Sequence, residues 1–179
     1  MLVTRLAIAC AAAAAALTMS IGPSSAATGG HLWNESPSTN LCLAIAWGGT
    51  SDNTMQMSTC AASSVQSWSL SGPFGGYTST GKYVQGYWLI DDAGYCLSGY
   101  GSGAKVYAVG CSETSLNQFW QERWEKKDGT YNYYELYLPL TGACLSVSGG
   151  STANGAPVIT WTCQDTPDQQ WGGPGTTVN

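Results

Sequence analysis

A pattern of cysteine, glutamine and tryptophan recurs three times along the chain and constrains the fold more than any other feature. Each copy runs from a Cys-Leu pair to a second cysteine and then to a Gln-x-Trp triplet. The copies begin at Cys42, Cys96 and Cys144 and end at Trp68, Trp120 and Trp171. These tryptophans lie 52 and 51 residues apart, and the second cysteine precedes the glutamine by 6, 7 and 6 residues. Such a period predicts three units of one kind, here called units one, two and three, that share a single core.

Each unit has a sequence pattern typical of short β-strands. Apolar and aromatic runs are broken by Gly, Ser, Asn and Pro, and no helical period persists. Residues 87–90 precede the first cysteine of unit two, residues 134–138 precede that of unit three, and residues 31–33 hold the same place in unit one. The sequence therefore predicts an all-β domain. Its expected core consists of the repeated leucines and tryptophans Leu43, Leu97, Leu145, Trp68, Trp120 and Trp171.

Two links between units differ in their turn chemistry. Asp128-Gly129 lies between residues 121–125 and 131–137, and this dipeptide suits a tight hairpin. Residues 71–82 are glycine-rich and longer, which predicts a looser hairpin. Unit three ends soon after Trp171, so its final strand is expected to be either frayed or completed by residues 31–33.

The N-terminus is typical of a secretion signal. Arg5 precedes an apolar run over residues 6–17, and small residues at 25–27 suit cleavage, so we expect a signal peptide over 1–27 and one domain over 28–179. A membrane anchor is the alternative, but the run is short for a bilayer and no second apolar segment follows. The mature protein is expected to be secreted, extracellular and without membrane insertion.

Cleavage would remove Cys10 and leave six cysteines, an even number in an oxidising compartment. The spacing favours three local bridges, Cys42–Cys60, Cys96–Cys111 and Cys144–Cys163, which close loops of 18, 15 and 19 residues. A loop of that length contributes about 3 kcal/mol in the chain-entropy model. No CxxC-like spacing indicates zinc, and we expect neither a metal nor a cofactor.

Composition disfavours several functions. Lys and Arg number 6 against 11 Asp and Glu, so no basic stripe is available for nucleic acid. His31 is the only histidine, so a Ser-His-Asp or Cys-His catalytic relay would have a single candidate base. The acidic pairs Asp91-Asp92, Glu122/Glu125 and Asp165/Asp168 show no setting suited to glycoside hydrolysis. We therefore expect that the protein is not an enzyme. Asn34-Glu35-Ser36 fits a glycosylation acceptor.

With three Cys-Leu pairs, three second cysteines and three Gln-x-Trp triplets, nearly the whole predicted mature chain resembles the ricin-type (QxW) β-trefoil lectin family, a ricin B-chain-like carbohydrate-binding module. The resemblance implies a twelve-stranded β-trefoil with pseudo-threefold symmetry, one disulfide per repeat and up to three shallow sugar sites. In that family an Asp directly after Cys-Leu anchors the sugar, an aromatic two residues before the second cysteine stacks on it, and Asn-Gln opens the triplet.

Unit three is the best match to this pattern. Trp161 stands at the stacking position and Gln169 is kept, whereas Ser146 replaces the anchor Asp, Asp168 replaces the Asn and Ile159 takes a polar position. Asp168 or Asp165 is expected to supply the missing carboxylate from the other side of the cleft. Trp161 alternates with threonines on a predicted strand, which leaves it either an exposed platform or a packing residue.

Units two and one keep fewer of the family's sugar-binding residues than unit three. Unit two retains Asn117 and Gln118, but Ser98 and Val109 replace the anchor and the aromatic, with Tyr107 or Tyr100 as substitutes for the latter. Unit one has Ala44, Ser58 and Val65 at the three positions and keeps Gln56, so its site is predicted to be inactive.

The glutamines of the triplets have two interpretations. Gln66, Gln118 and Gln169 either bind sugar or satisfy backbone groups of a turn near the buried tryptophan. The residues predicted to bind carbohydrate are Ser146, Trp161, Asp168, Gln169, Asn117 and Gln118.

Two functions follow from these sites. The first is a secreted, non-catalytic lectin for cell-wall or plant polysaccharide or galactoside-type sugars. The second is a degenerate trefoil that has lost sugar binding and acts on a secreted protein partner as an interaction or inhibitor module. No anchor aspartate remains in any unit, which favours the second, while Trp161 and Gln169 favour the first.

Overall fold

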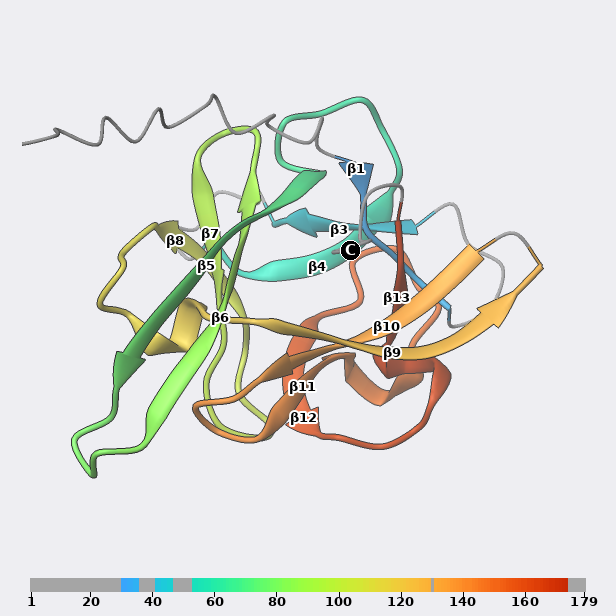
Figure 1. Cartoon of the computed structure of the whole chain (residues 1–179). Helices are drawn as coiled ribbons and strands as arrows, with labels where there is room; N and C mark the ends of the chain where they lie inside the picture. Colours follow the sequence, from blue (N-terminus) through green and yellow to red (C-terminus); the bar gives the residue numbers. More distant parts are fainter. Residues whose placement is uncertain (1–29, 36–40, 47–52, 130, 174–179) are drawn as a thin grey trace, which may run out of the picture.

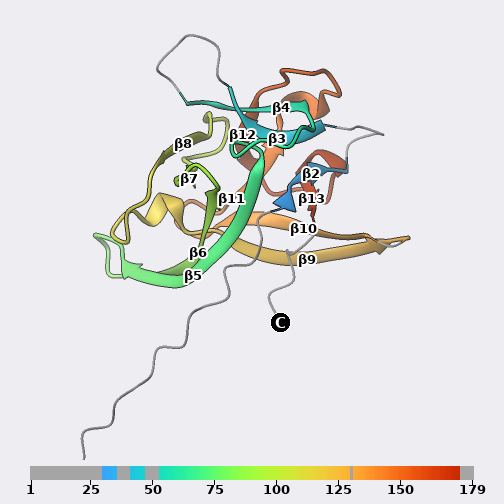
Figure 2. The same cartoon turned by 90° about the horizontal axis from the view of Figure 1, so that it is seen from above.

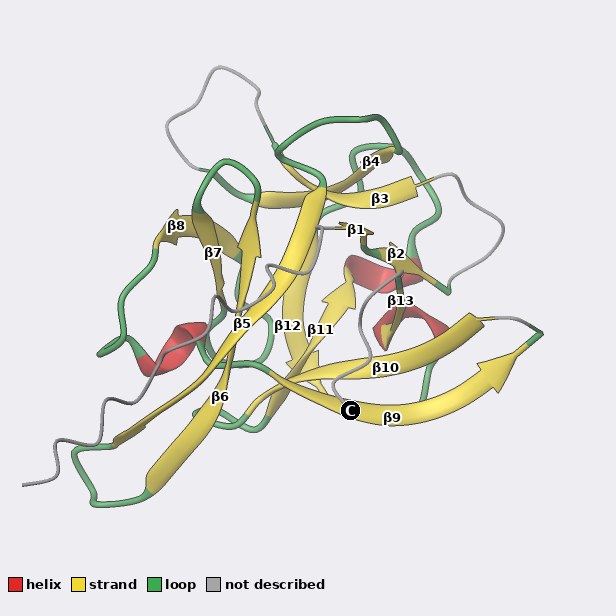
Figure 3. Cartoon of the chain, turned by 45° about the horizontal axis from the view of Figure 1, so that its top comes forward, coloured by secondary structure: helices red, strands yellow, loops and turns green. Residues whose placement is uncertain are grey.

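The computed structural model describes residues 30–35, 41–46, 53–129 and 131–173, and the regular secondary structure within them is almost entirely strand (Figure 3). The predicted signal peptide lies outside the described residues. The strands are β1 (Gly30–His31), β2 (Trp33–Asn34), β3 (Leu41–Ile45), β4 (Met55–Thr59), β5 (Ser67–Tyr77), β6 (Tyr83–Asp91), β7 (Tyr95–Ser98), β8 (Tyr107–Gly110), β9 (Gln121–Asp128), β10 (Tyr131–Leu138), β11 (Ala143–Val147), β12 (Val158–Thr162) and β13 (Gln170–Gly172). Three single 3-10 turns interrupt them, at Leu116–Gln118, Ser148–Gly150 and Pro167–Gln169. The prediction of an all-β domain is confirmed.

The three units have the same local plan, as Figure 1 shows. The Cys-Leu strands β3, β7 and β11 each pair antiparallel with the strand that leads to the second cysteine, β4, β8 and β12. The strands form a five-stranded sheet in the order β1-β5-β6-β7-β8 and an eight-stranded sheet, within which β10, β13 and β2 lie between the β11–β12 pair and the β3–β4 pair. Among the described residues, no helix is long and apolar enough to span a membrane.

All three predicted disulfides are present, Cys42–Cys60, Cys96–Cys111 and Cys144–Cys163. Each bridge joins the Cys-Leu strand of a unit to the end of the strand beside it. The predicted pairing of one disulfide per repeat is therefore confirmed.

The predicted core is also confirmed, and one hydrogen bond recurs within it in every unit. The three leucines and three tryptophans are all at most 3% exposed and lie in a single cluster. In each unit the tryptophan indole N–H donates to the carbonyl of the repeated leucine: Trp68 to Leu43 (3.0 Å), Trp120 to Leu97 (2.9 Å) and Trp171 to Leu145 (3.0 Å). A buried indole needs such an acceptor, and in every unit the main-chain carbonyl of the repeated leucine supplies it.

The end of unit three is completed by the N-terminal segment. Trp171 of β13 pairs with Asn34 of β2 on one side and with Tyr134 of β10 on the other. Of the two expectations for this strand, completion by the N-terminus is the correct one.

The link between units one and two corrects the prediction of a loose hairpin. β5 and β6 stay paired as far as Tyr77 and Tyr83, with one register shift between Ser71 and Phe74. Glycines allow this close packing: a Cβ at Gly86 would stand 2.7 Å from the carbonyl oxygen of Trp120, and one at Gly76 would stand 2.9 Å from the Leu116 side chain. The hairpin projects from the body on the side opposite the β9–β10 hairpin (Figures 1 and 2).

Candidate carbohydrate-binding site

A pocket of about 420 Å³ opens on unit three. Its walls come from β11, the turn after β11, β12 and the segment that leads to Trp171. The lining residues are Ser146, Ser148, Gly149, Gly150, Ile159, Trp161, Gln164 and Asp168. Three of the residues predicted to bind sugar, Ser146, Trp161 and Asp168, are therefore brought together.

The carboxylate of this pocket comes from the Gln-x-Trp side rather than from the Cys-Leu strand. The Ser146 hydroxyl donates to Oδ2 of Asp168 at 2.6 Å, across 22 residues of sequence. Ser146 is buried and Asp168 is partly exposed. Of the two aspartates considered, Asp165 instead accepts a hydrogen bond from Gln170 at 2.7 Å and does not line the pocket.

Asp168 is held from behind by the N-terminal strand. The side-chain amide of Asn34 donates to the Asp168 carbonyl (2.9 Å) and to the Gln170 carbonyl (3.1 Å). Asn34 is 5% exposed, so this potential glycosylation acceptor lies inside the fold. The repeat pattern does not reveal this contact, because Asn34 precedes the first repeat by eight residues.

Trp161 lies at the rim of the pocket and outside the core. It is 43% exposed and sits on β12 opposite Cys144. A loop of unit two approaches its ring, since a Cβ at Gly103 would stand 3.4 Å from Cζ3 of the indole. Its neighbour Thr160 points the other way, is fully buried and donates to the Gly101 carbonyl at 2.8 Å.

The glutamines of the three triplets have a common structural role. Each side-chain oxygen accepts from the backbone N–H just after the second cysteine, and each side-chain amide donates to the carbonyl just before it. The pairs of partners are Ala61 and Thr59 for Gln66, Ser112 and Gly110 for Gln118, and Gln164 and Thr162 for Gln169. Gln118 and Gln169 are at most 1% exposed. Because both polar atoms of each amide bond the backbone, the contacts favour the structural interpretation of these glutamines, and the role of Gln118 and Gln169 as sugar contacts stays a prediction.

Unit two has a neutral counterpart of the pair in unit three. The Asn117 amide donates to the Ser98 hydroxyl oxygen at 2.6 Å, and Ser115 donates to the Asn117 side-chain oxygen at 2.7 Å. The substitutes proposed for the missing aromatic are Tyr100 and Tyr107. Their rings contact each other edge to face, with 6.0 Å between the ring centroids. In unit one Ala44 is buried and provides no polar group at the anchor position.

Among the residues that the structure describes, Asp91, Lys126, Tyr133 and Glu135 have a perturbed pKa, and none of these four lines the pocket. Burial raises the pKa of Asp91, whose carboxylate accepts the Tyr95 N–H at 2.7 Å in the turn between β6 and β7. Burial also raises the pKa of Glu135, with a further contribution from the nearby Glu125. Asp91 supports a turn and Glu135 lies beside Arg123, with 3.9 Å between their charged atoms.

Comparison with known families and structures gives one family and one fold. Residues 28–171 match the family described as ricin-type β-trefoil lectin domain. Among curated proteins, no sequence matches the chain at a significant level.

Several solved structures share the fold. The designed threefold-symmetric protein ThreeFoil is 23% identical, with a TM-score of 0.64, and the match covers 80% of this chain and 96% of ThreeFoil. A Macrolepiota procera ricin B-like lectin, solved in complex with lactose, is 19% identical with a TM-score of 0.59, covering 86% and 99%. The exo-β-1,3-galactanase 1,3Gal43A from Clostridium thermocellum is 22% identical with a TM-score of 0.60, covering 83% of this chain and 30% of the galactanase. At these identities the likeness establishes the β-trefoil fold.

Proposed function

Because the chain belongs to the ricin-type β-trefoil lectin family, we propose that it is a secreted, non-catalytic carbohydrate-binding protein whose main sugar site is the unit-three pocket. Family membership supports carbohydrate binding in general. The observation that supports this particular site is the Ser146–Asp168 hydrogen bond in a pocket bordered by the exposed ring of Trp161.

The pocket has the two kinds of surface that a pyranose requires. The C–H face of a sugar ring packs on an indole, and its hydroxyls need paired donors and acceptors. Ser146 donates its proton to one oxygen of Asp168, which fixes the carboxylate and leaves further lone pairs for sugar hydroxyls. Hydrogen bonds to a carboxylate are stronger than neutral ones, so Asp168 takes over the role of the missing anchor.

Ile159 gives the pocket an apolar part where the family has a polar residue. A sugar with a C–H or methyl group at that point would lose no hydrogen bond there. The expected ligands are neutral cell-wall or plant polysaccharides and galactoside-type sugars, and the lactose bound to the Macrolepiota procera lectin makes galactosides the first probes to use.

The test is binding of the 28–179 chain to a glycan array, followed by titration of the bound sugar with tryptophan fluorescence as the signal. Trp161→Ala should weaken binding about tenfold to a hundredfold and remove the fluorescence response, because it deletes the stacking surface. Trp124→Ala is the matched control, since Trp124 is also exposed, at 63%, but lies on β9 away from the pocket-lining residues.

Asp168→Asn tests the displaced carboxylate. This variant reproduces in unit three the Ser–Asn pair of unit two and should weaken binding about tenfold, because a charge-assisted hydrogen bond is replaced by a neutral one. Binding that is unchanged in both Trp161→Ala and Asp168→Asn would contradict the assignment of this site. No binding to any glycan would favour the alternative of a trefoil that acts on a protein partner.

A further inference from the structure

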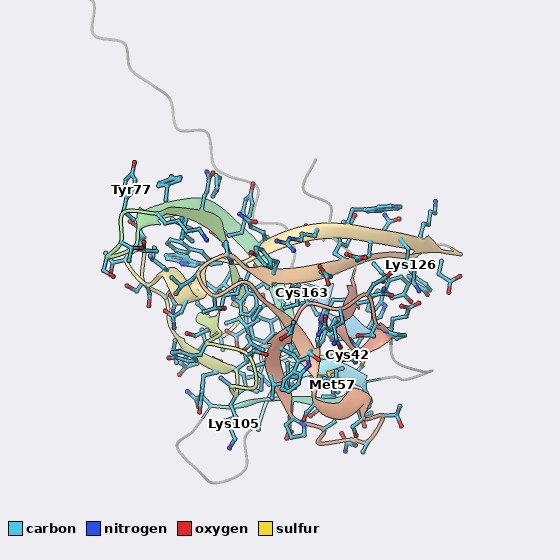
Figure 4. The ribbon with its side chains drawn as sticks, turned by 90° about the horizontal axis from the view of Figure 1, so that it is seen from below. Cys42, Met57, Tyr77, Lys105, Lys126 and Cys163 are labelled. Carbon is cyan, nitrogen blue, oxygen red and sulfur yellow. A yellow bond between two sulfur atoms is a disulfide. The ribbon has the colours of Figure 1, made fainter. Side chains whose placement is uncertain are left out.

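The outer face of the β5–β6 hairpin carries an aromatic pair that the unit-three site does not use. Tyr77 and Tyr83 are directly paired across the two strands, their ring centroids are 5.0 Å apart, and they are 72% and 53% exposed. Figure 4 shows Tyr77 at the outer end of the hairpin, whereas Lys105, which pairs with the pocket residue Ile159, lies on the opposite side of the molecule.

The phenol end of the Tyr83 side chain lies over Gly75 of the neighbouring strand. A Cβ at Gly75 would clash with the phenol oxygen of Tyr83 and would stand 2.7 Å from Cζ and 3.2 Å from Cε2 of its ring. Gly75 has no positive φ, so its absent side chain, rather than its backbone freedom, is what the ring requires. The phenol end of Tyr83 therefore packs against the strand at Gly75, while the side chain remains 53% exposed.

The opposite face of the hairpin holds this pair in place. Phe74 stacks on Trp88 with centroids 4.0 Å apart, and Val84 is buried. At the tip, the N–H of Thr78 donates to the Lys82 carbonyl (2.9 Å), and the N–H of Lys82 donates to the Thr78 hydroxyl (3.0 Å). The aromatic pair is thus presented by a packed hairpin with a closed turn, which lowers the entropy cost of binding.

The charges around the pair indicate what it can bind. Lys82 and Asp91 are the only charged residues between Ser67 and Asp91. Lys82 donates to the Pro139 carbonyl at 3.2 Å, and Asp91 is buried in its turn. The open face therefore offers phenol rings, with the exposed amide side chain of Gln85 on the same side of the hairpin, and the one cation of the hairpin, Lys82, is bonded to Pro139.

We propose that Tyr77 and Tyr83, supported by Gly75, form a second glycan-binding surface that takes the extended chain of a neutral polysaccharide. Stacking of successive sugar rings on open phenol faces needs no deep pocket, and the amide of Gln85 can bond their hydroxyls. This inference does not depend on the unit-three pocket. If both sites act, one polymer chain or particle can engage both and gain avidity without any new contact.

The experiment measures binding of the chain to xylan, galactan, cellulose and chitin, in soluble form by affinity electrophoresis or as particles by depletion. The wild type should bind at least one of them. The double variant Tyr77→Ala/Tyr83→Ala should weaken that binding at least tenfold, and Tyr77→Phe/Tyr83→Phe should retain it within about threefold, because the rings remain.

Two further variants separate the surface from general damage to the fold. Gly75→Ala displaces the Tyr83 ring without altering either tyrosine and should weaken polysaccharide binding about threefold or more, with the melting temperature close to that of the wild type. Tyr131→Ala removes a tyrosine of similar exposure, 54%, on β10 and should change binding less than twofold.

The outcomes distinguish this surface from the unit-three pocket. Loss of polysaccharide binding in Tyr77→Ala/Tyr83→Ala with an unchanged small-sugar affinity supports the surface even if Trp161→Ala has no effect. Wild-type binding by the double variant, or no binding of the wild type to any of the four polymers, would overturn it. So would a tyrosine-dependent association with phosphatidylcholine vesicles, or tyrosine-dependent self-association in sedimentation, without polysaccharide binding.

Discussion

One side-chain contact recurs in all three units and is made by glutamine each time. Gln66, Gln118 and Gln169 each connect the two backbone groups that flank the second cysteine of their unit. Such a glutamine does locally what a short strand pairing does elsewhere, because it satisfies one buried donor and one buried acceptor. This arrangement accounts for the glutamine of the Gln-x-Trp triplet without any contribution from a ligand.

Gln169→Ala should therefore lower the free energy of unfolding by about 2–4 kcal/mol, since the Gln164 N–H and the Thr162 carbonyl lose their partners. Urea denaturation followed by tryptophan fluorescence measures the change. Gln164→Ala, an exposed glutamine five residues earlier, should change stability by less than about 0.5 kcal/mol. Equal effects in the two variants would show that the contacts around Cys163 contribute little.

Asp91 gives the chain a pH dependence of known sign. Burial raises its pKa above the ordinary value of 3.8, so the folded chain holds this proton more tightly than the unfolded chain. The stabilisation linked to Asp91 is thus present below pH 3.8 and is lost as the pH rises through the raised pKa.

Asp91→Asn keeps an oxygen acceptor for the Tyr95 N–H and removes the titration. Its stability relative to the wild type should increase between pH 3 and pH 7, as measured by urea unfolding at several pH values. Asp92→Asn, an exposed change of one charge at the next residue, is the control. The same pH profile for both variants would argue against burial as the cause.

At the scale of elements, the β5–β6 hairpin depends on glycines that a sequence pattern does not explain. Gly86→Ala should cost about 1–3 kcal/mol, because the new Cβ would stand 2.7 Å from the Trp120 carbonyl oxygen and 2.8 Å from the Phe119 carbonyl carbon. Gly110→Ala on β8 is the matched control, since a Cβ there meets nothing within 4 Å. Thermal unfolding of the two variants gives the comparison, and equal melting temperatures would contradict the close approach.

The same hairpin shows why part of the fold could not be predicted. Glycine is disfavoured in strands, so the sequence of residues 71–82 favoured a loose link, whereas the structure uses Gly75 and Gly76 to make room for the side chains of Tyr83 and Leu116.

The fold class, the disulfides and the core could be predicted because the repeat places equivalent residues at equivalent positions. Repeat positions also predicted Ser146, Trp161 and Asp168, which the structure brings to one pocket.

The pocket residues Ser148, Gly150 and Gln164 were not predicted, because they lie in turns whose positions the repeat does not specify. The support from Asn34 was also missed, because its acceptor on Asp168 is 134 residues away in sequence. Contacts between β2 and the end of the described chain follow from how the trefoil closes and leave no periodic signal.

At the scale of the whole molecule, closure rests on strand pairing rather than on covalent bonds. All three disulfides act within units, at separations of 15 to 19 residues, while β2 connects β13 to β3. The two amide bonds of Asn34 reinforce this closure beside the unit-three pocket. Asn34 thus bonds both the closing strand β13, at Gln170, and the backbone of the pocket residue Asp168.

Asn34→Ala should lower the free energy of unfolding by about 1–3 kcal/mol and weaken sugar binding at unit three, because the Asp168 and Gln170 carbonyls lose their donor. Chemical denaturation and sugar titration of the same variant measure both effects. Asn132→Ala, a half-buried position on β10, is the control and should leave sugar affinity unchanged. Lower stability with unchanged sugar affinity would show that Asn34 stabilises the closed fold without shaping the pocket.

The hydrogen bonds that recur in all three units, those of the tryptophans and the triplet glutamines, end on main-chain atoms. The tryptophan indoles bond leucine carbonyls and the glutamines bond peptide groups, so these contacts do not depend on the side chain that follows each Cys-Leu pair. That position holds Ala44, Ser98 and Ser146 in the three units. Mutational drift can therefore silence, alter or restore one binding site at a time while the architecture persists, and a single gene can carry three sites at different stages of divergence.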